Sequence, residues 1–415
     1  MRGDRRIVIT GLGCVSPVGN DVSTAWSSLI NGVSGIGPLT AFDCEGFNAR
    51  IAGEVKGFEV ERYLSSKEAR ISDPFIHYGM AASIQAIEDA GLLAHPSNPE
   101  RYGLAIGSGI GGIHTIEEAY SAYLEKGPRK ISPFFVPGCI INMIAGNISI
   151  RYGYKGPNIS VVTACTTATH NIGQAARMIA YGDADVMLAG GSEYGTTPTA
   201  YGGFTAARAL STRNDDPTRA SRPWDSGRDG FVLSNGAGVV VLESLEHAMG
   251  RGAEIYAELI GFGMSGDAHH MTAPPESGSG AAQCMGLALE DAKLNPSDVD
   301  YINAHGTSTP VGDAAEVAAV RSVFGAHATQ LLMSSTKSMI GHMLGAAGGI
   351  ELIATVLSLK HSLVPPTINL EDPDPVCEGL DLVPGEARQA DIRVAVSNSF
   401  GFGGTNGSLV ISQYR

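Results

Sequence analysis

Strand-like runs alternate along the chain with segments whose apolar residues recur at helical spacing. Such runs begin at Ile7, Gly103, Ile159, Asp185, Val299, Met333 and Val394, and most of them end in a polar loop that contains glycine. Because strands and helices alternate in both halves, the pattern predicts a two-fold repeated α/β architecture with parallel or mixed sheets. The pattern begins again at Ala253, so we expect an N-terminal half at residues 1–252 and a C-terminal half at residues 253–415.

Two further segments are distinctive in their patterning. Residues 73–91 predict a capped helix with one apolar face, formed by Ile76, Met80, Ile84 and Ile87. Residues 211–238 are charged and rich in Asp, Arg and Gly, which predicts a long loop. A loop of that length in a compact protein is usually functional or interfacial.

One strand-to-helix junction contains a cysteine. The β-branched run at residues 159–163 predicts a buried strand, and residues 172–179 then show helical spacing with Gly182 as the stop. Cys165 therefore lies near a helix N-terminus, where unpaired N–H groups and the positive end of the helix dipole favour a thiolate. Cys165 is a candidate nucleophile; the alternative is a small buried apolar residue, the commonest fate of an intracellular cysteine.

Composition excludes several classes of protein. A net charge of −14 argues against nonspecific nucleic-acid binding. Six scattered cysteines without CxxC pairs argue against a disulfide framework and structural zinc, and indicate a reducing compartment. The first apolar run is too short for a signal peptide, and no run approaches the ~20 apolar residues of a membrane span. We therefore expect a cytoplasmic protein that binds neither membrane nor nucleic acid.

Two of the eleven histidines follow strand-like runs and stand beside glycine: His305 and His342. A metal site is disfavoured, because HExxH is absent and no nearby carboxylate completes a ligand set. The glycine-rich turns at residues 11–19 and 107–112 match neither a dinucleotide fingerprint nor a P-loop. A cysteine with two histidines and a lysine instead fits acyl transfer, with a sulfur nucleophile and N–H donors for a developing negative oxygen.

Four motifs, taken in their order along the chain, resemble those of a known protein family. They are Thr-Ala-Cys165-Thr-Thr, Asn-Ala-His305-Gly-Thr-Ser-Thr, Ser-Thr-Lys337-Ser-Met-Ile-Gly-His342 and Asn-Ser-Phe-Gly-Phe402-Gly-Gly-Thr-Asn. Together they resemble the β-ketoacyl-[acyl-carrier-protein] synthases of the thiolase superfamily, most closely the type II members. The resemblance extends from Ile7 to Leu409.

The resemblance implies a homodimeric acyltransferase of fatty-acid elongation, with a five-layered αβαβα thiolase-like fold of two pseudo-duplicated halves. Cys165 would accept an acyl chain from acyl-carrier protein, and malonyl-carrier protein would then lose CO₂ and attack the thioester. His305 and His342 would promote decarboxylation and stabilise the enolate. Lys337 would order the polar network around the second histidine, and the N–H groups of Cys165 and Phe402 would form the oxyanion hole.

Further residues match positions that bind substrate or carrier protein in the family. Thr307 and Thr309 would bond the phosphopantetheine arm, and Phe402 would gate the acyl pocket, hinged by its flanking glycines. The acyl-pocket candidates are Ile110, Phe135 and Phe204, with Phe400 as a further substrate-binding residue. The carrier-docking candidates are Lys67, Arg70, Arg129, Lys130 and Arg208, because an acidic enzyme needs local basic steering to meet an acidic partner.

The resemblance implies no metal and no cofactor beyond the carrier-bound arm, and leaves a monovalent cation open. Three positions depart from the family pattern: Ala168 replaces a frequent Gly, Asn235 replaces a carboxylate, and Ile71 replaces a basic residue of the docking patch. None of these departures removes a catalytic group.

Several alternatives remain. A coenzyme A thiolase would need a second catalytic cysteine, for which the late loop has Phe402 instead. An initiating synthase would carry Asn where this chain has His342. A chain-length factor lacks the nucleophile, and a cysteine hydrolase would need an activating His–carboxylate pair. A polyketide ketosynthase uses the same chemistry and stays open.

Overall fold

The computed structural model describes residues 5–414, and strands from both halves of the chain join in one mixed sheet. Its order is β10-β9-β13-β14-β8-β1-β7-β6-β4-β5. The strands are β1 Ile7–Val15, β4 Tyr102–Gly107, β5 Asn158–Ile159, β6 Val186–Glu193, β7 Gly236–Ser244, β8 Ala257–Gly266, β9 Tyr301–Asn303, β10 Leu332–Ser334, β13 Val394–Gly401 and β14 Thr405–Ser412. Two small sheets pair β2 Gly37–Pro38 with β3 Ile51–Ala52 and β11 Leu363–Val364 with β12 Arg388–Gln389.

The sheet repeats itself outward from a central seam. At the seam, β1 and β8 pair antiparallel through Val8 with Glu258 and Ile9 with Ala257. On one side β1 pairs antiparallel with β7, β7 antiparallel with β6, and β6, β4 and β5 run parallel. On the other side β8, β14, β13, β9 and β10 repeat the same directions. The predicted two-fold repeat with a mixed sheet is confirmed.

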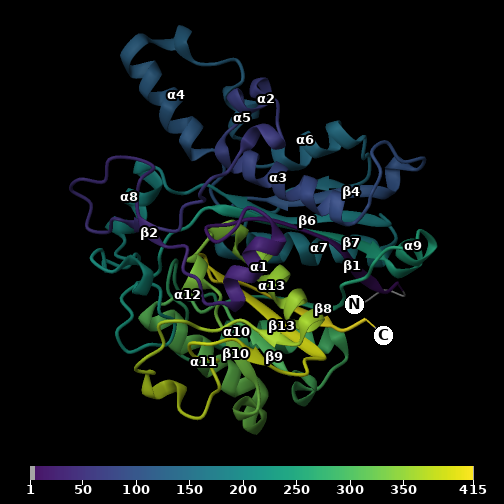
Figure 1. Cartoon of the computed structure of the whole chain (residues 1–415), viewed down its shortest axis with the longest axis vertical. Helices are drawn as coiled ribbons and strands as arrows, with labels where there is room; N and C mark the ends of the chain where they lie inside the picture. Colours follow the sequence, from purple (N-terminus) through teal and green to yellow (C-terminus); the bar gives the residue numbers. More distant parts are fainter. Residues whose placement is uncertain (1–4, 415) are drawn as a thin grey trace.

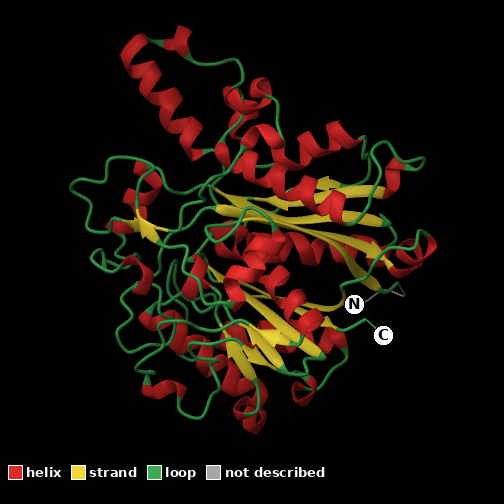
Figure 2. Cartoon of the chain, viewed as in Figure 1, coloured by secondary structure: helices red, strands yellow, loops and turns green. Residues whose placement is uncertain are grey.

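Helices separate and cover the two half-sheets (Figure 1, Figure 2). The outer faces are covered by α3 Pro74–Asp89 and α6 Met143–Tyr152 on one side, and by α10 Ser279–Ala292 and α11 Pro310–Phe324 on the other. Between the half-sheets lie α7 Thr167–Tyr181 and α13 Ala347–His361, which contact each other. The largest apolar core includes residues of both helices and both half-sheets. These layers confirm the predicted αβαβα order.

The remaining helices lie at the periphery or within the connections between strands. They are α1 Val22–Ile30, α2 Ser66–Arg70, α4 Ile113–Lys126, α5 Phe135–Cys139, α8 Pro198–Ala206, α9 Leu245–Gly250 and α12 Lys337–Ile340. The helix α4 projects away from the layered body, and the chain then returns to α5, which lies beside α2 (Figure 1). No helix within residues 5–414 is long and apolar enough to cross a membrane.

Local signals set the helix ends as expected. At the start of α3, the Asp73 carboxylate accepts hydrogen bonds from the N–H groups of Phe75 (3.2 Å) and Thr115 (2.8 Å), and Pro74 occupies the first turn. At the end of α7, Gly182 adopts φ +86°, a left-handed conformation that glycine accepts at little cost. Both predicted helices are confirmed.

The predicted strand at residues 159–163 is wrong in extent. Only Asn158 and Ile159 form β5, because beyond Ile159 the backbone turns toward the cysteine junction and bonds to side chains instead. Asn171, in α7, accepts from the N–H of Val161 (3.0 Å) and donates to its carbonyl (2.9 Å). The predicted loop at residues 211–238 is confirmed up to Asn235, and β7 begins at Gly236. The division of the chain at residue 252 stays a prediction.

Candidate active site

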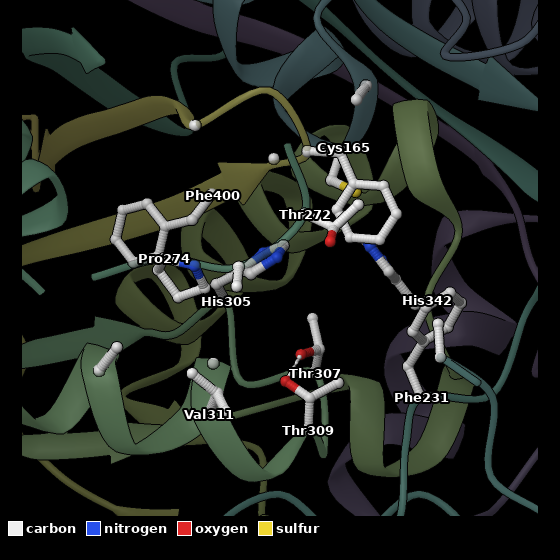
Figure 3. Close-up of a pocket in the computed structure, with 18 of the residues that line it drawn as sticks. Cys165, Phe231, Thr272, Pro274, His305, Thr307, Thr309, Val311, His342 and Phe400 are labelled. Carbon is white, nitrogen blue, oxygen red and sulfur yellow. Dashed lines mark hydrogen bonds between the residues drawn. The ribbon is translucent and has the colours of Figure 1, made fainter. Parts of the chain in front are cut away.

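Cys165 stands at the base of a cavity of about 370 Å³. It belongs to a 3₁₀ turn, Ala164–Thr166, that leads directly into α7, and only 7% of its surface is exposed. Ala164 adopts φ +49°, an uncommon conformation for a residue with a Cβ. The cavity is lined by ten of the residues named from the sequence: Ile110, Cys165, Phe204, Arg208, His305, Thr307, Thr309, His342, Phe400 and Phe402. Figure 3 shows several of them around the same space.

Burial opposes the expected preference of Cys165 for a thiolate. Burial raises the pKa of the Cys165 thiol to about 11. The backbone N–H groups of Phe402 and of Cys165 itself, together with the charge of Lys337, act in the opposite direction but do not outweigh burial. The thiol therefore rests protonated, and it needs a base when it attacks. The same two N–H groups are those predicted for the oxyanion hole.

His305 and His342 face one another across the cavity. Their ring centroids are 5.3 Å apart, with the ring planes nearly perpendicular. Burial lowers the pKa of both imidazoles well below the usual value, and the charge of Lys337 lowers it further. Both rings are therefore neutral near pH 7, and each can accept a proton at one nitrogen and donate from the other. His305 follows β9, as expected; His342 follows α12, because a short helix intervenes after β10.

Lys337 lies behind the histidines, buried together with Glu351. Its ammonium pairs with the Glu351 carboxylate and donates to the His305 carbonyl at 2.7 Å. It also lies 3.4 Å from Nδ1 of His305. Since an ammonium only donates, His305 Nδ1 is the acceptor, and the imidazole proton belongs on Nε2. Lys337 therefore orients the first histidine directly, whereas the family resemblance suggested the second.

Glu316 was not found from the sequence. Its carboxylate accepts from the N–H groups of His305 (2.9 Å) and Gly306 (2.8 Å), and it lines the cavity. Burial raises the pKa of Glu316 to about 7. Nearby, Asp313 accepts from the N–H groups of Ser308 (3.1 Å) and Trp224 (2.9 Å). Both acids lie on α11 and fix the His305 loop, but most of their partners are backbone groups that no sequence pattern reveals.

The outer part of the cavity is polar on one wall and aromatic on the other. Thr307 and Thr309 lie side by side, with hydroxyl oxygens 3.0 Å apart (Figure 3). Phe402 packs against Phe204 with ring centroids 6.3 Å apart, and Phe231 packs against His342 at 5.3 Å. Gly403 and Gly404, directly after Phe402, adopt φ +84° and +69°. Glycines in this conformation directly after Phe402 are consistent with the hinge that the sequence predicts for a gating loop.

Five predicted residues lie away from this cavity in the described chain. Phe135 is on α5 and does not line the cavity. Lys67 and Arg70 are on α2, and Arg129 and Lys130 are in the short turn after α4. Of the docking candidates, only Arg208 reaches the cavity lining.

The three departures are accommodated in different ways. Ala168 is fully buried in the first turn of α7. Asn235 does not lack partners, because its amide accepts from the Gly195 N–H (2.9 Å) and donates to the Thr196 hydroxyl (2.7 Å). Ile71 ends α2, beside Arg70.

Three buried oxygens next to the Lys337–Glu351 pair have no hydrogen-bond partner among the described residues: Asn303 Oδ1, Glu351 Oε2 and Ser397 Oγ. Asn303 and Ser397 are register partners on β9 and β13, and the Asn303 amide donates toward the Glu351 carbonyl (3.4 Å). Carboxylate, amide and hydroxyl oxygens are the ligands that hard cations prefer, and the charge of Glu351 is already paired with the Lys337 ammonium. These residues could hold a monovalent cation, behind the histidines and outside the reacting space.

Comparisons with known proteins agree with this geometry. The β-ketoacyl synthase N-terminal domain matches residues 4–248, and the C-terminal domain matches residues 256–371. The 3-oxoacyl-[acyl-carrier-protein] synthase 2 of Vibrio harveyi is 60% identical, over 99% of both chains. That of Staphylococcus aureus strain COL is 51% identical over the full length of both chains.

Solved structures show the same fold. A β-ketoacyl synthase from Burkholderia phymatum superimposes with a TM-score of 0.93 at 38% identity, covering 99% of this chain and 100% of the other. The ketosynthase of a type II polyketide system, solved with its acyl-carrier protein and bound to a hexaketide, gives a TM-score of 0.91 at 36% identity, with the same coverage. On the family matches and these identities, the chain belongs to the β-ketoacyl synthase family.

Proposed function

We propose that the protein is a 3-oxoacyl-[acyl-carrier-protein] synthase II, which extends an acyl chain held on Cys165 by decarboxylative condensation with malonyl-carrier protein. The observation that carries the proposal is one cavity that presents a thiol, two neutral imidazoles and two backbone N–H groups. Full-length relatives with this activity in their names reach 60% identity.

In the first half-reaction, the Cys165 sulfur attacks the carbonyl carbon of the acyl thioester. A neutral imidazole takes the thiol proton, and the N–H groups of Cys165 and Phe402 bind the oxyanion. Collapse of the tetrahedral intermediate breaks the carbon–sulfur bond to the carrier, whose departing thiolate recovers the proton. The acyl group is then a thioester on Cys165.

In the second half-reaction, the malonyl group loses CO₂ and leaves an enolate. Its oxygen accepts hydrogen bonds from His305 and His342, for which neutral N–H donors are sufficient. The carbanion attacks the Cys165 thioester, the sulfur leaves as a thiolate that takes up a proton from solvent, and the β-ketoacyl product departs on the carrier. Lys337 and Glu316 hold the His305 loop in place throughout.

Carrier protein would approach through the mouth of the cavity. Thr307 and Thr309 line the cavity and would hydrogen-bond the phosphopantetheine arm, and Arg208 also lines the cavity. Lys67, Arg70, Arg129 and Lys130 remain proposed docking residues, which would steer an acidic carrier despite the net charge of −14.

We further propose a homodimer. The segment from α4 to α5 exposes a set of large apolar side chains: Ile116, Tyr120, Tyr123, Leu124, Ile131, Phe134, Val136 and Ile140. Large exposed apolar patches on a protein surface mark interaction sites, of which a subunit interface is one kind. Phe135 lies on the same segment, so any place it has in the acyl pocket would come from the partner subunit's Phe135. Size-exclusion chromatography with light scattering tests this, and a monomeric mass at micromolar concentration would refute it.

The alternative, a polyketide ketosynthase, shares the chemistry. The relatives named 3-oxoacyl-[acyl-carrier-protein] synthase 2 reach 60% identity, whereas the type II polyketide ketosynthase structure has 36%. This difference favours the fatty-acid reaction. The six free cysteines fit a reducing location such as the cytoplasm.

Intact-protein mass spectrometry tests the proposal. The protein is mixed with hexadecanoyl-carrier protein and then with malonyl-carrier protein, beside a Cys165→Ala variant. We expect an acyl adduct that requires Cys165 and is discharged into a β-ketoacyl product. A folded protein that forms no adduct would contradict the proposed function.

A further inference from the structure

A buried carboxylate that the reaction does not use lies behind the cavity wall next to Cys165. Glu193 is the last residue of β6 and has no exposed surface. A buried carboxylate is costly unless its oxygens accept hydrogen bonds, so its partners show what it holds.

Four uncharged donors, from two separate segments, converge on Glu193. Oε1 accepts from the Ser108 hydroxyl (2.7 Å) and the Ile110 N–H (3.1 Å). Oε2 accepts from the Gly109 N–H (2.8 Å) and the Gly345 N–H (3.0 Å). Three of these donors belong to the loop after β4 and the fourth to the turn before α13. One side chain thus joins the two halves of the chain beside the nucleophile.

Both segments supply walls of the cavity. Ile110 follows Gly109, Leu344 precedes Gly345, and both apolar side chains line the cavity and pack in the cluster that contains Cys165. The packing leaves little freedom, since a Cβ at Gly109 would lie 2.6 Å from Glu193 Oε2 and one at Gly345 would lie 2.9 Å from it. Any shift of the carboxylate therefore moves a wall.

We propose that Glu193 is a positioning residue that fixes the walls formed by Ile110 and Leu344, and thereby sets the passage of a long acyl chain past Cys165. The inference rests on the proposed function for the nature of the chain. The effect of the Glu193 charge on Cys165 does not depend on that function. Glu193 raises the pKa of the Cys165 thiol, whereas Lys337 lowers it.

The isosteric variant Glu193→Gln isolates this role. An amide NH₂ cannot accept, so two of the four donors lose their acceptor while the shape is kept. Ser108→Ala removes a single donor and is a milder second variant. Glu243→Gln is the matched control, because Glu243 is equally buried but binds Arg251 and His247 near the Ser244 end of β7.

The first measurement compares acylation by hexadecanoyl- and butanoyl-carrier protein. For Glu193→Gln we expect the long-chain rate to fall at least about tenfold more than the short-chain rate, with Ser108→Ala changed in the same direction by less. The second measurement is the pH profile of Cys165 alkylation by iodoacetamide. Loss of the negative charge should move the profile of Glu193→Gln to lower pH, and Glu243→Gln should change neither readout.

Two results would overturn the proposal: unchanged chain-length ratio and alkylation profile in Glu193→Gln, or the same changes in Glu243→Gln. If the unaltered protein accepts no acyl chain at all, the proposed function fails instead. The alkylation profiles then still decide whether Glu193 acts on Cys165.

Discussion

Two junctions in the molecule have nearly the same backbone and opposite chemistry. The helices α7 and α13 are each 15 residues long and begin at Thr167 and Ala347, 180 residues apart. A 3₁₀ turn precedes each, and its first residue, Ala164 or Leu344, has a positive φ of +49° or +45°. The second residue of the turn is Cys165 in one half and Gly345 in the other.

The difference shows where function resides in a duplicated fold. The first junction presents a sulfur to the cavity, whereas the second gives only a backbone N–H, which Glu193 binds. Conversely, His342 precedes Leu344 by two residues and faces the cavity, while the corresponding Val162 lies 47% exposed on the surface. The repeat supplies two junctions of nearly the same backbone conformation. Single side chains decide that the first junction carries the nucleophile and that the second provides electrostatic support.

The largest expected effect is the loss of the one side chain that makes the first junction reactive. Cys165→Ala should lower condensation at least about 10³-fold, because no nucleophile remains. Steady-state kcat/KM with malonyl-carrier protein measures it, with Cys44→Ala as a cysteine control that should retain activity. Substantial turnover by Cys165→Ala would contradict the view that the first junction carries the nucleophile.

The helices after the two junctions differ at a second pair of positions. Glu351 in α13 pairs with Lys337, whereas the corresponding Asn171 in α7 bonds only to backbone. Lys337→Met should lower the free energy of unfolding by about 3–5 kcal/mol, because an unpaired buried carboxylate remains. Asn171→Ala should cost about 1–3 kcal/mol.

Urea denaturation measures both variants. The double variant Lys337→Met, Glu351→Met should recover much of the stability, since no buried charge is left. A double variant as unstable as the single one would show that packing, and not charge, distinguishes the helices.

A methyl group should not be tolerated at the second junction. Gly345→Ala would place its Cβ against the Gly109 N–H and Glu193, and we expect a loss of about 1–3 kcal/mol. Gly286→Ala is the control, since nothing lies within 4 Å of its Cβ on α10, and it should stabilise by about 0.4–1 kcal/mol. Equal urea midpoints for the two variants would contradict this reading of the second junction.

The acid dependence of stability should reflect the two neutral histidines. Their pKa values are lowered in the folded state, so below about pH 6.5 the unfolded chain binds protons that the folded chain does not. Stability is therefore present above pH 6.5 and falls as the pH decreases, by up to about 1.4 kcal/mol per pH unit for each histidine. Unfolding free energies between pH 7 and 5.5 should fall less steeply for His342→Gln, and equal slopes would be evidence against a neutral His342.

The last prediction concerns reactivity rather than structure. Because the pKa of Cys165 is about 11, its alkylation by iodoacetamide should rise about tenfold per pH unit between pH 7 and 10. Peptide mass mapping follows the site, with Cys165→Ala giving the background. A rate that is flat above pH 8 would mean that the helix N-terminus outweighs burial after all.

Local patterns were enough to predict much of this architecture. The Cys165 junction, the end of α7 at Gly182 and the strand before His305 follow from apolar spacing and glycine placement, which act over a few residues. The resistance of Cys165 to ionisation was not predictable, because burial depends on residues far away in the chain. Glu193 and Glu316 were missed for the same reason, since most of their partners are backbone N–H groups brought close only by the fold.

The high pKa of the buried nucleophile also affects how the protein withstands oxidants. Peroxides react with thiolates, and burial raises the pKa of Cys165 so that the thiol form predominates at pH 7. The sulfur is thus protected from sulfenic acid formation before a substrate arrives. The sulfur becomes reactive when an acyl thioester is next to it and a neighbouring imidazole takes its proton. The burial that lowers the reactivity of the free thiol therefore also protects it from oxidation between turnovers.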